Sequence, residues 1–292
     1  MQKFLQRLIT VFIATGFALA ASGPATAQPQ RPTYPNQAPD TICPRATLKA
    51  LVDSYSSALA AHDPGKAPLT RNIRFTENAV LLSAGNSSLW KGAGAWDLRN
   101  DLIDTQRCGT VSWGLIDEDG RPVHAAIRLQ TDGKGHITEA EHLTAKEDGF
   151  FYNPKAIMAS SYLDWEMILP PGERSSREAM TAAANDYFAE FDKTHYVSVP
   201  YADLCDRWEN GRMTSPTHKC NPPIRGDENI HPPRRIPLVD LEAGIVAAFV
   251  HFDRQWDDVH IMKMQRGRVS YMMVVVVKDA KSDGWLPAEK KP

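Results

Sequence analysis

Two stretches of the chain carry one pattern, and this repeat constrains the fold more than any other feature of the sequence. In each stretch an amphipathic helical segment carries a tyrosine, Tyr55 in the first and Tyr187 in the second. A Glu-Asn pair follows at the same distance, as Glu77-Asn78 and Glu209-Asn210. Solenoid repeats recur about every 20–50 residues. The two stretches here are much farther apart in the sequence, which indicates a duplicated domain rather than a solenoid.

Further matches follow in the same order along the chain. Residues 115–125 (Leu-Ile-Asp, then Val-x-Ala) match residues 238–248 (Leu-Val-Asp, then Val-x-Ala). Gly135-His-Ile is matched by Gly267-Arg-Val, and each opens a strand-like run. The common order favours duplication over chance, so the sequence predicts two halves with the same fold.

Length and composition agree with two globular domains. A chain of 292 residues can form two domains of ordinary size, each with its own core. Its hydrophobic content of 42% and charged content of 23% are typical of a folded protein. The formal net charge is only -2 and no run is strongly basic, so we expect no nucleic-acid partner.

The N-terminus has the pattern of a secretory signal. Lys3 and Arg7 precede an apolar run, and the small residues Ala25-Thr-Ala27 follow it. This pattern predicts a signal peptide over residues 1–27, because the apolar run is too short to span a bilayer. An uncleaved anchor is the alternative. We therefore expect a periplasmic or secreted protein without a membrane span after cleavage, and a Pro-rich linker over residues 28–42.

Export changes the interpretation of the four cysteines, since disulfides persist in oxidising compartments. Cys205 and Cys220 bracket a loop rich in Gly, Thr, Pro and His, so we pair them, and by elimination Cys43 pairs with Cys108. A metal site that includes His218 is the alternative, although the spacing lacks a paired C-x-x-C.

Periodicity predicts helices first and strands afterwards in each half. In the first half we expect a helix over 47–61, a short helix or turn over 69–75, a strand over 79–83, a short helix over 92–102, and strands over 110–116, 123–130 and 137–145. In the second we expect a helix from Ser176, a loop over 205–233, and strands over 236–252, 259–265 and 269–278. This order indicates α+β domains with helices on one face of an antiparallel sheet.

The same order, together with the hairpin Asp132-Gly-Lys-Gly-His-Ile-Thr-Glu-Ala-Glu, resembles the NTF2-like (SnoaL-like) superfamily. The tandem arrangement is similar to that of uncharacterised secreted proteins with SnoaL-like domains. The resemblance implies two tandem cones over residues 43–165 and 174–286, joined by a linker over 166–173. Cones of this kind include isomerases, dehydratases, epoxide hydrolases, polyketide cyclases and non-catalytic binding modules, so the fold alone does not decide the activity.

One strand differs between the halves and suggests where chemistry takes place. Residues 137–142 contain Glu139, Glu141 and His142, whereas residues 269–274 are mainly apolar. Alternation places the two glutamates on one face of the strand and His142 on the other. The glutamates are either an acid/base couple or part of a solvated face. His142 is either a general base or a structural histidine. We therefore expect the first half to be catalytic and the second to be a packing partner or an apolar pocket.

The remaining candidates surround that strand. Tyr55 is a candidate oxyanion donor and Arg128 a candidate anion or orienting group, with core packing and a surface ion pair as their alternatives. Three tryptophans are candidates for lining a pocket for an aromatic ligand, and core packing is their alternative role: Trp90, Trp96 and Trp113. The repeated Glu-Asn pair and the segments His62-Asp63 and Asp192-x-x-His195 fit turns.

No cofactor motif is present: the sequence lacks a nucleophile elbow, a phosphate loop, a dinucleotide fingerprint and an HExxH motif. A divalent metal bound by His251, Asp253, Asp257, Asp258 and His260 is conceivable, but we predict no metal and no cofactor. We expect an exported acid/base enzyme (lyase, isomerase or hydrolase) for a small hydrophobic or aromatic metabolite. A non-catalytic small-molecule-binding or protein-interaction module of the cell envelope is the alternative, and a homo-oligomer is left open.

Overall fold

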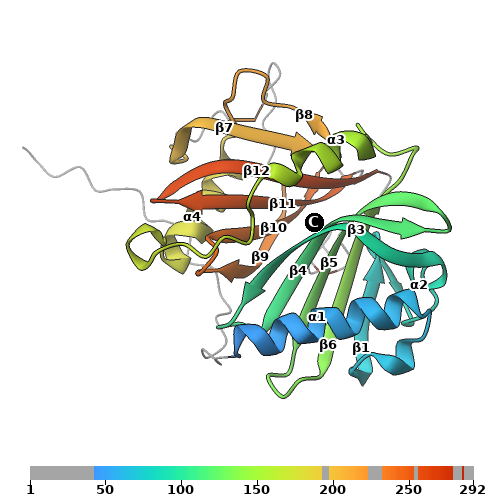
Figure 1. Cartoon of the computed structure of the whole chain (residues 1–292). Coiled ribbons are helices and arrows are strands. Elements are labelled where there is room, and N and C mark those ends of the chain that lie inside the picture. The colour runs from blue at the N-terminus through green and yellow to red at the C-terminus, as the bar shows by residue number, and fades with distance from the viewer. Residues whose placement is uncertain (1–42, 193–196, 223–231, 253–255, 279–284, 286–292) are drawn as a thin grey trace, which may run out of the picture. The chain divides into compact units, whose positions relative to one another are not determined.

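The structure is a computed structural model that describes residues 43–192, 197–222, 232–252, 256–278 and 285 (Figure 1). The predicted signal peptide and Pro-rich linker lie outside the described residues. Residues 38–292 cluster as one compact unit, apart from residues 1–37. Within the described part of the chain, no helix combines the length and apolar character needed to cross a membrane.

The N-terminal half, residues 43–145, is a six-stranded sheet with one long helix along it (Figure 1). Its strands lie in the order β2-β1-β6-β5-β4-β3. Its elements are α1 (Arg45–Ala60), the 3-10 turn η1 (Pro64–Lys66), β1 (Leu69–Glu77), β2 (Val80–Leu82), α2 (Ser88–Gly92), β3 (Ala93–Asp104), β4 (Gly109–Glu118), β5 (Arg121–Thr131) and β6 (Ile137–Ala145).

The C-terminal half, residues 174–278, repeats this arrangement with the order β8-β7-β12-β11-β10-β9. It consists of α4 (Arg177–Ala189), β7 (Tyr201–Glu209), β8 (Arg212–Met213), β9 (Arg234–Asp240), β10 (Ile245–Phe252), β11 (Trp256–Gln265) and β12 (Arg268–Lys278). The connection between the halves contains α3 (Pro154–Ala159), η2 (Ser160–Tyr162) and η3 (Pro171–Glu173).

Strand register shows the duplication in detail. Phe75 of β1 pairs with Ala140 of β6, and Arg207 of β7 pairs with Met272 of β12. Both residue numbers of the second pair are 132 higher than those of the first pair. The irregularity beside the pair Leu69–Ile137 recurs beside Tyr201–Val269 with the same shift. The two halves are therefore tandem α+β cones, as the sequence predicts.

One of the sequence matches is wrong in detail. Residues 115–125 span β4 and β5, whereas residues 238–248 span β9 and β10. The sheet orders make β10, not β9, the equivalent of β4, so this match is one strand out of step. Short apolar strands next to tight turns look alike, and only strand order distinguishes them.

Each sheet is mixed rather than wholly antiparallel, because β1 runs parallel to β6 and β7 runs parallel to β12. This pairing overturns several local predictions. Residues 69–75, expected to be a short helix or turn, lie in β1, and residues 93–102 of the expected helix 92–102 lie in β3. The expected loop 205–233 includes the end of β7 and all of β8. The expected strand 236–252 is β9 and β10, separated by a turn in which Gly244 adopts φ +67.

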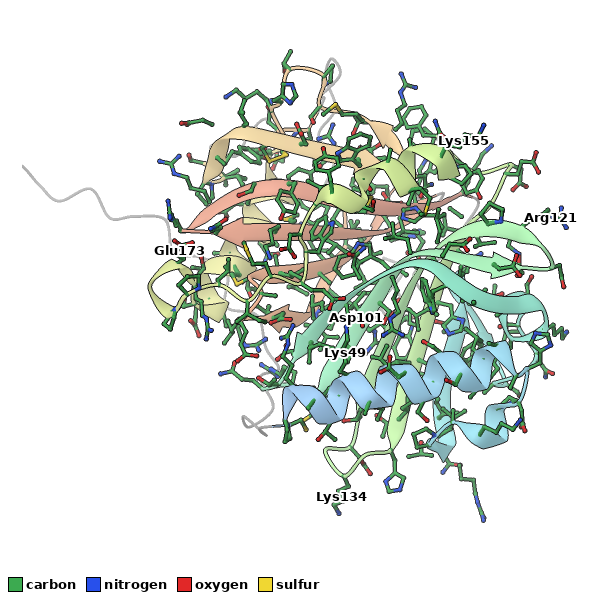
Figure 2. All side chains as sticks on the ribbon, in the orientation of Figure 1. Lys49, Asp101, Arg121, Lys134, Lys155 and Glu173 are labelled. Carbon is green, nitrogen blue, oxygen red and sulfur yellow. A yellow bond between two sulfur atoms is a disulfide. The ribbon has the colours of Figure 1, made fainter. Side chains whose placement is uncertain are left out.

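Both long helices form where the sequence indicates, and for local reasons. In α1 the apolar stripe is buried: Leu48, Leu51, Val52, Tyr55, Ala58 and Leu59. In α4, the helix expected from Ser176, the Ser176 hydroxyl caps the first turn by accepting a hydrogen bond from the Ala179 N–H at 3.2 Å. The hairpin before β6 also forms, with Asp132 accepting the Lys134 N–H at 2.8 Å, and Lys134 projects outward at its tip (Figure 2).

The two faces of each sheet have different partners. On one face the N-terminal sheet packs against α1, with Phe75, Ile127 and Ala140 in that core. On the other face, residues such as Val111 and Leu143 join the core of the opposite half, which includes Ile245 and Met273. A side chain's place in a strand therefore decides whether it meets the helix or the other half.

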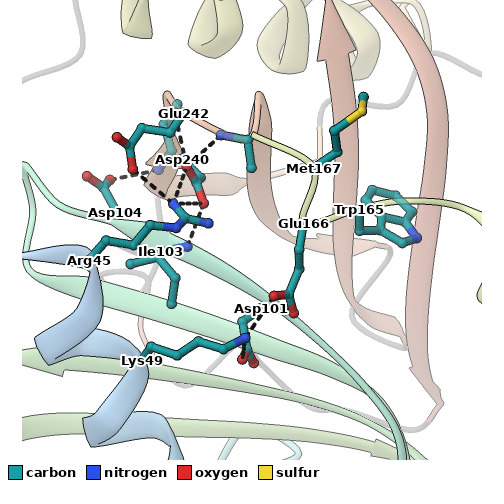
Figure 3. A network of polar contacts seen from close by, with 12 residues as sticks. Arg45, Lys49, Asp101, Ile103, Asp104, Trp165, Glu166, Met167, Asp240 and Glu242 are labelled. Atoms are coloured by element: carbon teal, nitrogen blue, oxygen red, sulfur yellow. Dashed lines mark hydrogen bonds and ion pairs between the residues drawn. The ribbon is translucent and has the colours of Figure 1, made fainter. Parts of the chain in front are cut away.

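Reciprocal ion pairs join the halves at their edge strands (Figure 3). Asp240 of β9 accepts hydrogen bonds from the Arg45 guanidinium at 2.8 Å and the Ile103 N–H at 2.9 Å. In return, Asp104 of β3 accepts from the Arg177 guanidinium at 2.6 Å and the Val239 N–H at 2.7 Å. The same kinds of contact run in both directions, as in the interface of a symmetric dimer.

A second charged contact in this region joins α1 to the connection between the halves. The Lys49 ammonium lies 2.9 Å from Asp101 of β3 and 2.7 Å from Glu166 (Figures 2 and 3). Glu166 also accepts the Asp101 N–H at 2.9 Å. The connection is therefore fixed to the N-terminal half by side-chain contacts.

The structure contains the two disulfides that the sequence predicts, Cys43–Cys108 and Cys205–Cys220. They close loops with sequence separations of 65 and 15 residues. Loop-closure entropy predicts that serine replacement lowers the free energy of unfolding by about 4 kcal/mol for the first pair and about 3 kcal/mol for the second. Guanidinium unfolding of the two double variants tests this, and midpoints equal to that of the wild type would contradict it.

Candidate active site

Tyr55 and His142 meet inside the N-terminal half. Tyr55 is on the buried stripe of α1, and His142 shares a face of β6 with Ala140, the face that packs against this helix. The Tyr55 hydroxyl and Nε2 of His142 are 2.8 Å apart and share a hydrogen bond. The two residues are 87 positions apart in the chain, so only the fold brings them together.

Glu77 extends this contact to a carboxylate. Its Oε2 is 3.5 Å from Nδ1 of His142, and its oxygens accept the Ser88 N–H at 2.9 Å and the Leu89 N–H at 3.2 Å. Burial opposes ionisation, but His142 and these hydrogen bonds outweigh it and lower the pKa of Glu77. The result is a buried chain of polar contacts, Glu77–His142–Tyr55.

Aromatic side chains enclose this chain. Trp90 meets the Tyr55 ring edge-on with centroids 5.4 Å apart, and Phe75 meets the His142 ring edge-on at 4.9 Å. Burial and the negative charge of Glu77 raise the pKa of Tyr55. The phenolate is therefore disfavoured, and the hydroxyl stays a hydrogen-bond donor.

The other predicted acid/base residues lie on the opposite face of the sheet. Arg128 is 2.7 Å from Glu141 and 2.8 Å from Glu139, and Glu141 also binds Arg235 of β9 at 2.6 Å. Arg128 stacks on the Trp285 ring, with its guanidinium carbon 4.5 Å from the ring centroid. These residues form a contact between the halves, on the face of β6 opposite to His142, which agrees with the alternation along this strand.

The three candidate tryptophans also separate. Trp90 lies beside Tyr55, and the partly exposed Trp96 packs against the same core. Trp113 points to the opposite face and meets Trp165 edge-on, with centroids 5.2 Å apart. The sequence could not separate Trp113 from the other two, because it does not show which face of the sheet the helix covers.

The two repeated asparagines, Asn78 and Asn210, have the same structural role. Asn78 and Asn210 adopt φ +46 and +42 at the ends of β1 and β7. The Asn78 side chain accepts the Thr144 N–H at 2.8 Å, and the Asn210 side chain accepts the Val276 N–H at 3.1 Å. This agrees with the turn interpretation of the pair, but Glu77 has the additional contact with His142 that the turn interpretation missed.

The C-terminal half is not simply apolar inside, which corrects the expectation for it. Arg207 is buried at the position equivalent to Phe75 and donates to the Tyr187 hydroxyl at 3.3 Å and to the Cys220 carbonyl at 2.9 Å. His260 of β11 pairs with Val274, the equivalent of His142, so the histidine is on the neighbouring strand. Alternation of Asp258, His260 and Met262 along β11 was the available signal.

The metal alternatives find no support among the described residues. The His251 and His260 side chains point to opposite faces, with Phe249 beside the first in one core and Met262 beside the second in another. Within the described ranges no three metal-ligating side chains cluster, and Asp253 lies outside them. Cys205 and Cys220 are joined to each other.

The predicted post-helix turn at His62-Asp63 is present. His62 adopts φ +55 after α1, and its Nε2 lies 2.8 Å from the Ala93 carbonyl oxygen. Asp192 is buried after α4, and its predicted partner His195 lies outside the described residues.

Two buried histidines make the fold sensitive to acid. Burial lowers the pKa of His124, which contacts Asn210 at 2.9 Å, to about 4, and burial together with Arg207 lowers that of His260 to about 3. Below about pH 6.5 the two histidines become protonated in the unfolded chain but stay neutral in the folded chain, so the free energy of unfolding falls with falling pH. From pH 7 to pH 5 we expect a loss on the order of 2 kcal/mol for each histidine. Urea unfolding at both pH values checks this, and equal stabilities would contradict it.

The comparisons with known proteins each cover less than half of the chain. Residues 173–276, from η3 into β12, match a family model described as a domain of unknown function (DUF8021). No curated protein matches the chain at a significant level.

Three solved structures are similar. An NTF2-like protein of unknown function from Cytophaga hutchinsonii is 15% identical over 34% of this chain and 89% of its own, with a TM-score of 0.27. A steroid delta-isomerase from Pseudomonas aeruginosa is 13% identical over 40% and 89%, with a TM-score of 0.28. An NTF2-like protein of unknown function from Shewanella baltica is 10% identical over 35% and 93%, with a TM-score of 0.23.

Proposed function

We propose that the N-terminal half is the catalytic half of an exported acid/base enzyme that uses no cofactor. Its substrate is a small hydrophobic or aromatic metabolite, and the reaction is that of a lyase, isomerase or hydrolase. The observation that carries the proposal is the Glu77–His142–Tyr55 chain inside an aromatic enclosure. A carboxylate, an imidazole and a hydroxyl in contact are the groups that proton transfer requires.

In the proposed step, Tyr55 gives its hydroxyl proton to an oxygen of the substrate. At the same time the imidazolium of His142 gives its Nε2 proton to the Tyr55 oxygen, so the tyrosine stays neutral, as its raised pKa favours. Glu77 stays ionised and holds the proton on Nδ1, which keeps the ring oriented. The reverse transfer lets His142 act as a base through the same hydroxyl.

The proposal extends to location and domain organisation. The mature chain begins near Gln28, lies in the periplasm or outside the cell, and consists of SnoaL-like domains over residues 43–165 and 174–286 with a linker over 166–173. Support comes from the signal-like N-terminus and from the two disulfides, which persist in oxidising compartments. A small molecule is the proposed partner, and a homo-oligomer is compatible with it.

A non-catalytic binding or interaction module of the cell envelope is the second candidate. It is favoured by burial, because Tyr55 is 1% exposed and His142 0% exposed. A module of this kind binds small molecules but does not convert them, and this difference can be measured.

Replacement of Tyr55 by phenylalanine tests the proposal. On a panel of uncharged aromatic and alicyclic ketones, esters and epoxides, we expect Y55F to lower kcat/KM by about 100-fold, the effect of one oxyanion donor. Tyr271 is the matched control, because its hydroxyl donates only to the Asp164 carbonyl at 3.3 Å, and Y271F should stay within about twofold of the wild type. Equal rates for Y55F and the wild type would refute the role of Tyr55, and binding without turnover would favour the second candidate.

A further inference from the structure

Strand β11 places two ionisable side chains on the face that α4 covers. Asp258 is 7% exposed and His260 is 3% exposed. They share this face with Met262, which packs in the same core as Tyr187 and Phe188 of α4. The pair therefore lies inside the C-terminal half, away from the Glu77–His142–Tyr55 chain.

The neighbouring strands offer these groups no polar partner. Asp258 lies between Val250 and Val276 in the sheet. His260 lies between Ala248 and Val274. In the described part of the chain, Oδ1 of Asp258 and Nδ1 of His260 have no hydrogen-bond partner. Because buried polar atoms are nearly always hydrogen-bonded, this pair is a stability liability in the unliganded protein.

Burial and the nearby charges favour the neutral form of both groups. Burial, then the negative charges of Glu209 and Asp257, raise the pKa of Asp258 well above its ordinary value. Burial, then the positive charge of Arg207, lower the pKa of His260 to about 3. In their neutral forms, the carboxyl group and the imidazole can each donate and accept a hydrogen bond.

Aromatic rings surround the histidine and reach toward the surface. The His260 ring lies 4.9 Å from the Phe188 ring and 6.3 Å from the Phe252 ring, centroid to centroid. Phe191 packs against Phe252 at 5.3 Å, and both are only partly buried. An apolar molecule that displaces Phe191 and Phe252 would meet Asp258 and His260 behind them.

We propose that Asp258 and His260, with the rings of Phe188, Phe191 and Phe252, form a second ligand site, the β11 site. Its ligand is an uncharged, mainly apolar molecule with a hydroxyl or carbonyl oxygen, which exchanges hydrogen bonds with the two polar groups. The site does not depend on the reaction proposed for the N-terminal half.

Fluorescence titration of the full chain with 2-naphthol tests this site, because 2-naphthol is uncharged, aromatic and carries one hydroxyl. Asp258→Val should weaken binding about tenfold or more, the effect of one lost hydrogen bond to a buried group. Asp258→Asn keeps a donor and an acceptor and should bind within about threefold of the wild type. The exposed Asp97 serves as control, and Asp97→Val should leave binding unchanged.

Thermal unfolding without ligand separates a ligand-binding role from a structural one. Asp258→Val removes a buried carboxyl whose Oδ1 has no hydrogen-bond partner among the described residues, so we expect the unfolding midpoint to rise while 2-naphthol binding weakens. A fall in the midpoint of Asp258→Val, or the same affinity as the wild type, would overturn the proposal. Absence of saturable 2-naphthol binding, or tighter binding of the 2-naphthoate anion, would overturn it as well.

Discussion

Replacement of His142 by phenylalanine is expected to lower turnover by about 10²–10⁴-fold, the range that general acid/base catalysis contributes. The imidazole contacts both the Tyr55 hydroxyl and the Glu77 carboxylate, at 2.8 and 3.5 Å. Without it, no proton can pass between them. The loss should appear in kcat, with KM little changed, because the substrate meets Tyr55 rather than His142.

The variant must be compared with a histidine outside the site. His136 lies in the exposed hairpin before β6, so His136→Phe should keep the turnover of the wild type. Phenylalanine in place of His142 preserves the edge-on contact with Phe75 but leaves the buried Tyr55 hydroxyl without its hydrogen-bond partner, which costs about 1–3 kcal/mol of stability. Circular dichroism at the assay temperature shows whether the variant is folded. A folded H142F with an unchanged kcat would contradict the proton-transfer role.

Replacement of Asp240 by alanine is expected to remove about 3–5 kcal/mol of stability, the usual effect of breaking a buried ion pair. Asp240 is fully buried and accepts hydrogen bonds from the Arg45 guanidinium and from the N–H groups of Ile103 and Ala243. Its removal leaves the N–H groups of Ile103 and Ala243 without this acceptor, and leaves Arg45 with the 3.4 Å contact to Glu242. Urea unfolding measures the loss, which is a large part of the stability of an ordinary domain.

Glu242 provides the matched control for Asp240. Its carboxylate lies 3.4 Å from the same Arg45 guanidinium, but its side chain is 39% exposed. An exposed pair of this kind contributes less than about 1 kcal/mol, so Glu242→Ala should be close to the wild type. Because Asp104 makes the reciprocal contacts, Asp104→Ala should resemble Asp240→Ala. Similar small losses for all three variants would show that the reciprocal ion pairs do not hold the halves together.

The sequence predicted the helices and strands whose hydrophobic pattern lies within a single segment. The stripe of α1 and the alternation of β4, β5 and β6 lie within single segments, and the structure has them nearly where expected. The parallel pairing of β1 with β6 is not local, and the exposed polar residues Arg71 and Asn72 hide this strand. The start of β3 was missed for a related reason, since its register shifts twice between Ala93 and Leu98.

The candidate residues show the same limit. Alternation correctly separated His142 from Glu139 and Glu141, but it does not show which face of the sheet the helix covers. The contact of Arg235 with Glu141 comes from the other half and could not be anticipated. Comparison of β6 with β12 alone also suggested that the second half had lost its ionisable lining, because His260 lies one strand away on β11.

Hydrogen–deuterium exchange at carbon tests the central claim most directly. In D2O, a site that acts as a base toward carbon replaces the C–H protons next to a carbonyl group by deuterium, and proton NMR follows the loss of signal. For at least one ketone of the panel, the wild type and His136→Phe should exchange these protons faster than buffer, and His142→Phe should return to the buffer rate. Exchange by His142→Phe at the rate of the wild type, or no exchange above buffer by the wild type, would contradict the account.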